Sequence, residues 1–95
     1  MTNRPLTTPV INLNGDRAET LMVTSLAVVT ALNTLIEAMR DASPHGRNFQ
    51  CSPEGSYDAA RAQFREHCNQ LRSMESFYVE QYLDLQEQNE DRKNR

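Results

Sequence analysis

The chain has 95 residues, of which 13 are acidic and 10 are Lys or Arg, so its formal net charge is −3. This length allows one domain at most, and the acidic balance excludes a general nucleic-acid binder, which needs a basic excess to contact phosphates. Only three Phe, three Tyr and no Trp are available for a core. Because so small a core makes a monomer marginally stable, the composition favours self-association.

Residues 1–15 are predicted to form an extended N-terminal arm, since this segment contains two prolines and few apolar residues. The arm ends in a short apolar run, Val10, Ile11 and Leu13, before the turn-forming pair Asn14-Gly15. Asp16 and Glu19 then have the spacing of a capping box, which predicts that a helix starts here.

A first helix is predicted over residues 17–41. Its central stretch, Thr20 to Ile36, contains no charged residue across seventeen positions. At about 100° per residue its large apolar side chains cover roughly half of the helix, more than one partner helix can bury. On the other side, small side chains recur at alternating steps of four and three, which lets a second backbone approach closely. We therefore expect self-association through this helix, with the interface at Thr24, Ala27, Ala31, Thr34 and Ala38.

The same uncharged stretch sits at the short edge of what spans a bilayer. Six of its seventeen residues are Thr, Ser or Asn, and the mean hydropathy of the whole chain is −0.70. Asp16 and Glu19 directly precede it, which a secretory signal would not show. We expect neither a membrane partner nor a signal peptide.

The loop after the first helix is the most chemically varied part of the chain. Ser43, Pro44 and Gly46 are predicted to end the helix. His45 and Arg47 then lie between one helix end and the next helix start, where they could bind an anion such as a phosphate. Alternatively, both side chains hydrogen-bond the last carbonyls of the first helix. Both interpretations stay open.

A second helix is predicted over about residues 56–88, with its start favoured by Gly55 just before it. Its apolar positions trace a seam typical of paired helices: Tyr57, Ala60, Phe64, His67, Leu71, Met74, Tyr78, Tyr82 and Leu85. The predicted fold is all-α: an antiparallel hairpin of two long helices with an extended N-terminal segment, which self-associates into a bundle. The arm would cover the overhanging end of the second helix, in its own chain or a neighbour, and residues 86–95 are predicted to be a frayed or disordered charged tail.

Three arginines project from one side of the second helix: Arg61, Arg65 and Arg72. They would bind a phosphate-bearing ligand or an acidic partner, because Arg contacts both groups in a bidentate manner. The alternative is a solvated face paired with Asp58 and Glu75. Together with the loop, the candidate binding residues are His45, Arg47, Asn48, Phe49, Arg61, Arg65 and Arg72.

No motif for catalysis, metal or cofactor binding is present. His45, Cys51, His67 and Cys68 lack the spacing of a metal site, so we predict no metal and no cofactor. Two irregularly placed cysteines do not form a disulfide framework, which favours reduced thiols. With no triad, phosphate loop or isolated carboxylate pair, we predict that the protein is not an enzyme.

Two sequence segments resemble small proteins of tailed bacteriophages and prophages, a family with no agreed activity. They are I-N-L-N-G at Ile11 to Gly15 and S-P-H-G-R-N-F at Ser43 to Phe49, and the similarity covers most of the chain. The resemblance implies a viral origin and a location in the host cytoplasm. In relatives an acidic residue often follows the arginine, whereas this chain has Asn48.

Phage accessory proteins of this size commonly act by binding. The first hypothesis is a protein that counters host defence by contacting a host protein, through the loop Pro44 to Phe49 and the outer face of the second helix. The second is an oligomeric sponge that sequesters a cyclic or other nucleotide signal, with phosphates held by His45, Arg47, Arg61 and Arg65. A third is a minor structural component of the virion.

Overall fold

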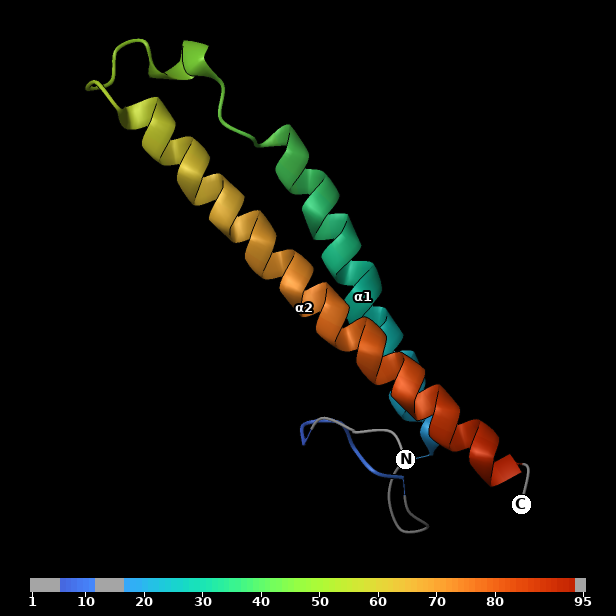
Figure 1. Ribbon diagram of the computed structural model, residues 1–95. Helices are drawn as coiled ribbons and strands as arrows, with labels where there is room; N and C mark the ends of the chain where they lie inside the picture. Colours follow the sequence, from blue (N-terminus) through green and yellow to red (C-terminus); the bar gives the residue numbers. More distant parts are fainter. Residues whose placement is uncertain (1–5, 12–16, 94–95) are drawn as a thin grey trace.

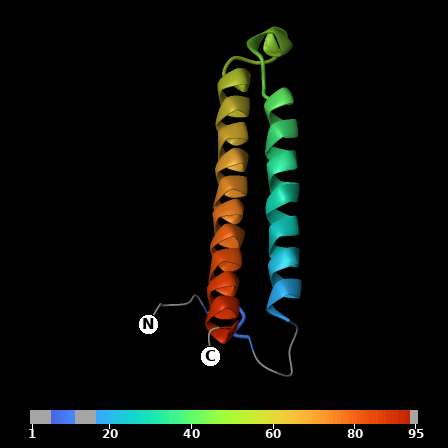
Figure 2. The same cartoon turned by 90° about the vertical axis from the view of Figure 1, so that its right-hand side faces the viewer.

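The computed structural model describes residues 6–11 and 17–93, which form two long helices joined by a short connection. The elements are α1 (Ala18–Asp41), the 3₁₀-helix η1 (Gly46–Phe49) and α2 (Ser56–Lys93). Figures 1 and 2 show α1 and α2 lying side by side in opposite directions, in a rod of 66 × 23 × 19 Å. The predicted all-α antiparallel hairpin is confirmed, and its self-association stays a prediction.

α1 begins one residue later than predicted. Its N-cap residue is Arg17, which makes no side-chain capping hydrogen bond. The predicted capping box includes Asp16, which lies outside the described residues. At the other end α1 stops at Asp41 as predicted, and the backbone N–H groups of Ala42 and Ser43 donate to carbonyls of its last turn. These backbone bonds satisfy acceptors that the helix end would otherwise leave open.

The two helices meet along a seam in which α2 contributes residues at unbroken steps of four and three. These are Phe64, Cys68, Leu71, Glu75, Tyr78, Tyr82 and Leu85, all buried or half-buried. The sequence placed His67 and Met74 in this seam, and that prediction was wrong because both are exposed. Unbroken alternation keeps every seam position facing α1, and the apolar pattern did not reveal it because two of those positions hold Cys68 and Glu75.

A hydrogen bond inside the seam fixes the register of the hairpin. Gln81 donates from Nε2 to the hydroxyl oxygen of Ser25 at 2.9 Å, and Ser25 is only 3% exposed. Full apolar burial is rare in the described residues, where it is confined to Ala18, Ile36 and Leu85. The hairpin therefore has a thin core, as its composition indicated.

Glu75 places a carboxylate in the middle of the seam. Its Oε2 atom is buried and has no hydrogen-bond partner among the described residues. Leaving a buried acceptor unpaired costs about 1–3 kcal/mol. We expect Glu75→Leu to raise the free energy of unfolding by about 1 kcal/mol, measured by urea denaturation, since the side chain is only half-buried. Glu80→Leu, at an exposed position of the same helix, is the control and should change it little; a Glu75→Leu protein less stable than the natural one would contradict this account.

The N-terminal arm packs against the end of α2 in the same chain (Figure 1). Gln88, only 9% exposed, accepts a hydrogen bond from the Ile11 N–H at 2.9 Å through its Oε1. Its Nε2 donates to the Pro9 carbonyl at 3.1 Å and to Asp84 Oδ2 at 3.0 Å. The predicted apolar cover is realised only in part, because Ile11 is half-buried, Val10 is 71% exposed and Leu13 lies outside the described residues.

α2 continues to Lys93, five residues beyond the end predicted for the second helix at about residue 88, and the frayed or disordered tail over residues 86–95 stays a prediction. Asn94 and Arg95 lie outside the described residues. The fading apolar pattern after Leu85 suggested a helix end, but Gln88 is held by the arm through polar contacts that hydrophobic periodicity does not register. Glu, Gln, Arg and Lys are also good helix formers, which supports the last turns.

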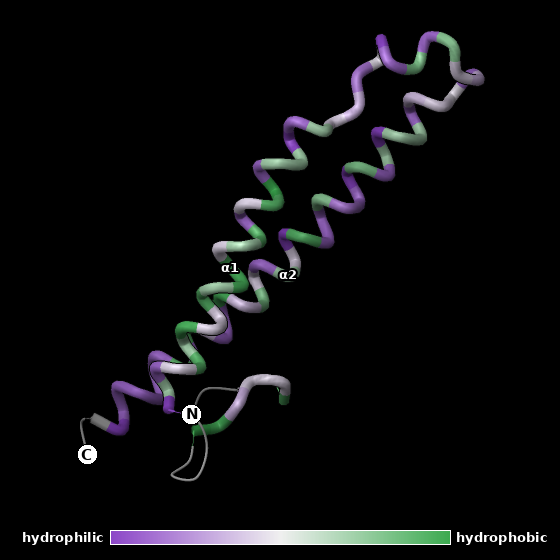
Figure 3. The backbone as a smooth tube through the Cα atoms, turned by 180° about the vertical axis from the view of Figure 1, so that it is seen from behind, coloured by the Kyte–Doolittle hydropathy of each residue, from purple (hydrophilic) through white to green (hydrophobic). Residues whose placement is uncertain are grey.

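The side of α1 that faces away from α2 is apolar and open. Val23, Leu26 and Leu35 are 66%, 48% and 45% exposed, so one partner helix does not cover the broad apolar face, as expected. In Figure 3 the hydrophobic positions are concentrated along α1. The small residues proposed as an interface are likewise exposed: Thr24, Ala27, Ala31, Thr34 and Ala38.

α1 is also long and apolar enough to cross a membrane, judged by length and composition alone. Its mean hydropathy reaches 1.6, and only 17% of the most apolar window is buried within the molecule. Core helices and signal sequences pass the same test, so this is weak evidence. The low burial shows instead that α1 has a face left without a partner.

Candidate binding site at the loop end

The connection between the helices is ordered by its own backbone. The N–H of Asn48 donates to the His45 carbonyl at 3.0 Å, and that of Ser52 donates to the Phe49 carbonyl at 3.1 Å. Gly55 has a φ of +86°, a left-handed conformation that other residues rarely adopt. The chain turns there and α2 starts at Ser56, as the sequence favoured.

Residues of the loop pack around the ring of Tyr57, which lies in the first turn of α2. The Phe49 ring packs on it at a centroid distance of 5.7 Å, and Gly46 lies so close that a methyl group there would touch the ring at 3.5 Å. On the helix side, the Arg61 guanidinium carbon sits 5.5 Å from the ring centroid, a cation–π distance. Tyr57 therefore anchors η1 and holds one arginine near the loop.

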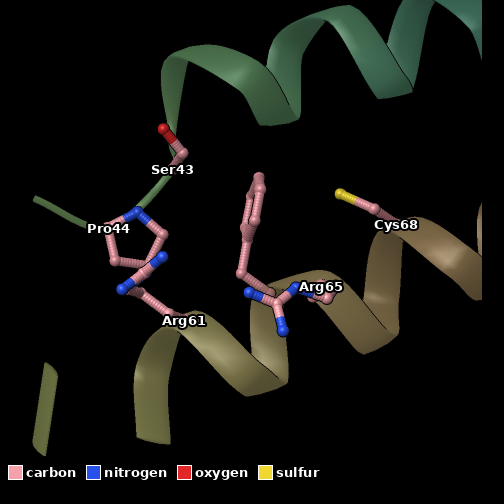
Figure 4. A pocket seen from close by; sticks show the side chains of 6 residues that line it. Ser43, Pro44, Arg61, Arg65 and Cys68 are labelled. Carbon is pink, nitrogen blue, oxygen red and sulfur yellow. The ribbon is translucent and has the colours of Figure 1, made fainter. Parts of the chain in front are cut away.

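An open pocket of about 300 Å³ lies where the end of α1 faces the start of α2 (Figure 4). Ser43 and Pro44 come from the segment that leaves α1, and α2 supplies the other lining residues, Arg61, Phe64, Arg65 and Cys68. Both arginines are exposed, and no described carboxylate lies within ion-pairing distance of either. The pocket thus combines apolar walls with two cations that have no carboxylate partner among the described residues, one of which lies over the Tyr57 ring.

The structure brings together only part of the predicted binding set. Arg61 and Arg65 line the pocket, but His45, Arg47 and Asn48 are exposed and do not line it. Phe49 is half-buried against Tyr57, which gives it a packing role. Arg72 is exposed and lies about 10 Å further along α2 than Arg65, at 1.5 Å per residue.

Two interpretations of the charged residues did not involve a ligand, and neither set of contacts is found among the described residues. The last carbonyls of α1 are bonded by backbone N–H groups, so the structure gives no sign that His45 and Arg47 cap the helix. The pairing of the arginines with Asp58 and Glu75 is likewise not found within the described part of the chain. Within residues 6–11 and 17–93 neither pocket arginine has a carboxylate partner, and both guanidinium groups are exposed to a ligand or partner.

Sequence reasoning missed the apolar lining of this pocket. Pro44 was interpreted as a helix stop, Phe64 as a seam residue and Cys68 as a reduced thiol outside any metal site. Their common location follows from the hairpin register, which sets the end of α1 opposite the second to fourth turns of α2. The unbroken four–three alternation that starts with Phe64 and Cys68 and runs to Leu85 was the signal that could have located the two α2 residues.

Cys51 is exposed and Cys68 is half-buried, and both are free thiols. Within residues 6–11 and 17–93, no three His, Cys, Asp or Glu side chains are arranged to hold a metal ion. The described site therefore offers cationic and apolar contacts.

No protein family model, curated protein or solved structure matches the chain. The similarity of the loop and arm motifs to tailed-phage proteins stays a prediction.

Proposed function

We propose that the chain is a small phage accessory protein that acts without catalysis, by binding a host protein and thereby countering a host defence. The observation that carries the proposal is the loop-end pocket, where exposed Arg61 and Arg65 flank apolar walls. Binding energy in protein interfaces is concentrated where arginines and apolar or aromatic side chains occur together. The pocket has this composition at one tip of the rod.

The charge distribution supports an acidic partner segment. The chain as a whole carries a net charge of −3, so an acidic partner is repelled by most of the molecule and attracted locally by two arginines without carboxylate partners. The walls formed by Pro44 and Phe64 suit an apolar side chain beside that acid. We therefore infer a partner segment with an acidic residue next to a large apolar one.

The test is a quantitative pull-down from host lysate with two variants, one double and one single. Arg61→Glu combined with Arg65→Glu should reduce recovery of the host partner at least about tenfold, because two attractive contacts become repulsive. Arg72→Glu is the matched control, since it is an exposed arginine of the same helix outside the pocket, and recovery should be kept. Equal loss in both proteins, or no loss in either, would sink the assignment of the partner site.

A second candidate function rests on the same two arginines. Guanidinium groups bind phosphate as well as carboxylate, so the pocket could sequester a cyclic or other nucleotide signal. Titration with a panel of cyclic and linear nucleotides distinguishes the two functions. Micromolar binding that Arg61→Ala with Arg65→Ala abolishes would favour sequestration, whereas absence of binding favours the protein partner.

A further inference from the structure

The open face of α1 is the largest feature that the proposed function leaves unexplained. It has a shallow apolar groove lined by Val23, Leu26, Ala27, Thr30 and Ala31. The threonine hydroxyls do not need water as an acceptor: Thr24, Thr30 and Thr34 each donate to a carbonyl of their own helix at 2.9–3.1 Å. The central part of this face, from Thr24 to Thr34, can therefore be buried without leaving these three hydroxyl donors unpaired.

The spacing of this face is self-complementary. Small residues occur at Thr20, Thr24, Ala27, Ala31, Thr34 and Ala38, and their steps of four, three, four, three and four are the same in both directions. Consider two antiparallel α1 helices related by a two-fold axis at the level of Val29. Ala27 of one copy then lies beside Ala31 of the other. The same operation sets Thr24 beside Thr34 and Thr20 beside Ala38, which is the layer pattern of antiparallel helix pairs.

Each end of α1 carries one positive and one negative side chain, Arg17 and Glu19 at the start and Arg40 and Asp41 at the end, and all four are exposed. In an antiparallel pair Glu19 lies within one residue of the level of Arg40 of the second copy. Antiparallel pairing brings Arg17 level with Asp41 of the second copy, whereas parallel pairing brings like charges together. Helix dipoles favour the same direction, because each positive N-terminus then lies beside a negative C-terminus.

We propose that two copies of this chain pair through the open face of α1, antiparallel about an axis at the level of Val29, and form a layer of four helices with the two α2 helices on the outside. The pairing supplies the apolar burial that the thin core of one hairpin lacks. A membrane is the less suitable occupant, since α2 runs along α1 and exposes charged residues such as Glu66, Arg72 and Glu80 at the same levels.

Mass measurement of the purified full chain tests the pairing. We expect a particle of twice the 10.9 kDa chain mass by multi-angle light scattering. Ala31→Glu buries a charge beside the axis and should raise the dissociation constant at least about 100-fold, giving a monomer. Glu54→Ala, on the loop, is the control and should leave the dimer intact. A monomeric natural chain, or an Ala31→Glu dimer as tight as the natural one, would overturn the proposal.

Cysteine cross-linking tests the direction of the pairing. In a Cys51→Ser, Cys68→Ala background, chains carrying Thr20→Cys should form a disulfide with chains carrying Ala38→Cys, and neither should cross-link to its own kind. Cross-linking of Thr20→Cys to itself would show a parallel pair and overturn the arrangement. Flotation with phosphatidylcholine and phosphatidylglycerol vesicles gives a separate check: capture of the chain as a monomer would assign the face to lipid.

Discussion

Replacing Leu85 with Ala is expected to lower the free energy of unfolding by about 3 kcal/mol, because removing a fully buried leucine costs its transfer energy and leaves a cavity. Leu85 is 0% exposed and is the largest fully buried side chain described. With a core this thin, such a loss removes a large fraction of the total stability. Urea denaturation followed by circular dichroism measures it.

Leu83→Ala is the matched control for this experiment. It makes the same chemical change two residues away, at a side chain that is 53% exposed, so the expected loss is below about 0.5 kcal/mol. Similar losses for the two variants would mean that Leu85 is not the centre of the core. If the hairpins pair as proposed, both unfolding curves shift with protein concentration, and the comparison must be made at one concentration.

Replacing Gln88 is expected to release the N-terminal arm from α2. Gln88→Glu keeps the size of the side chain but turns the Nε2 donor into an oxygen, which then faces the Pro9 carbonyl and the Asp84 carboxylate. Two attractive contacts become repulsive, so we expect the Ile11 amide to exchange with solvent deuterium at least about tenfold faster. Hydrogen exchange followed by mass spectrometry of an arm peptide measures this.

Gln63→Glu serves as the control for arm release, because Gln63 is exposed on α2 and lies 25 residues before Gln88, to which the arm is bonded. It makes the same charge change and should leave the Ile11 exchange rate unchanged. An Ile11 amide as slow in Gln88→Glu as in the natural chain would show that the Gln88 hydrogen bonds do not hold the arm.

The sequence predicted the hairpin well because both helices have strong local signals. The uncharged stretch from Thr20 to Ile36 and the stop signals at Ser43 and Pro44 define α1, and Gly55 defines the start of α2. The seam was predicted less well in the middle of α2. Hydrophobicity favoured Met74 over Glu75 and left His67 in the seam, whereas the geometry of an unbroken alternation selects Glu75 and Cys68.

Contacts between distant segments were the least predictable. The loop-end pocket depends on how the end of α1 faces α2, and no local pattern contains that register. The hydrogen bond between Ile11 and Gln88 joins residues 77 positions apart. Gln88 is a polar residue in a charged stretch, so hydrophobic periodicity did not indicate this contact. Arg61 and Arg65 could be selected as candidates from their helical spacing, but the finding that His45 and Arg47 do not line the same pocket required the fold.

The hydrogen bonds between Gln88 and the arm can form only after α2 has been translated as far as Gln88. Most contacts in a helical hairpin join residues close in sequence or across one turn, and such contacts form early. The arm is synthesised well before its anchor, because Ile11 and Gln88 lie 77 positions apart. The arm therefore has no partner in Gln88 until that residue has been translated, and a message cut short before Gln88 yields a hairpin in which Pro9 and Ile11 lack these hydrogen bonds.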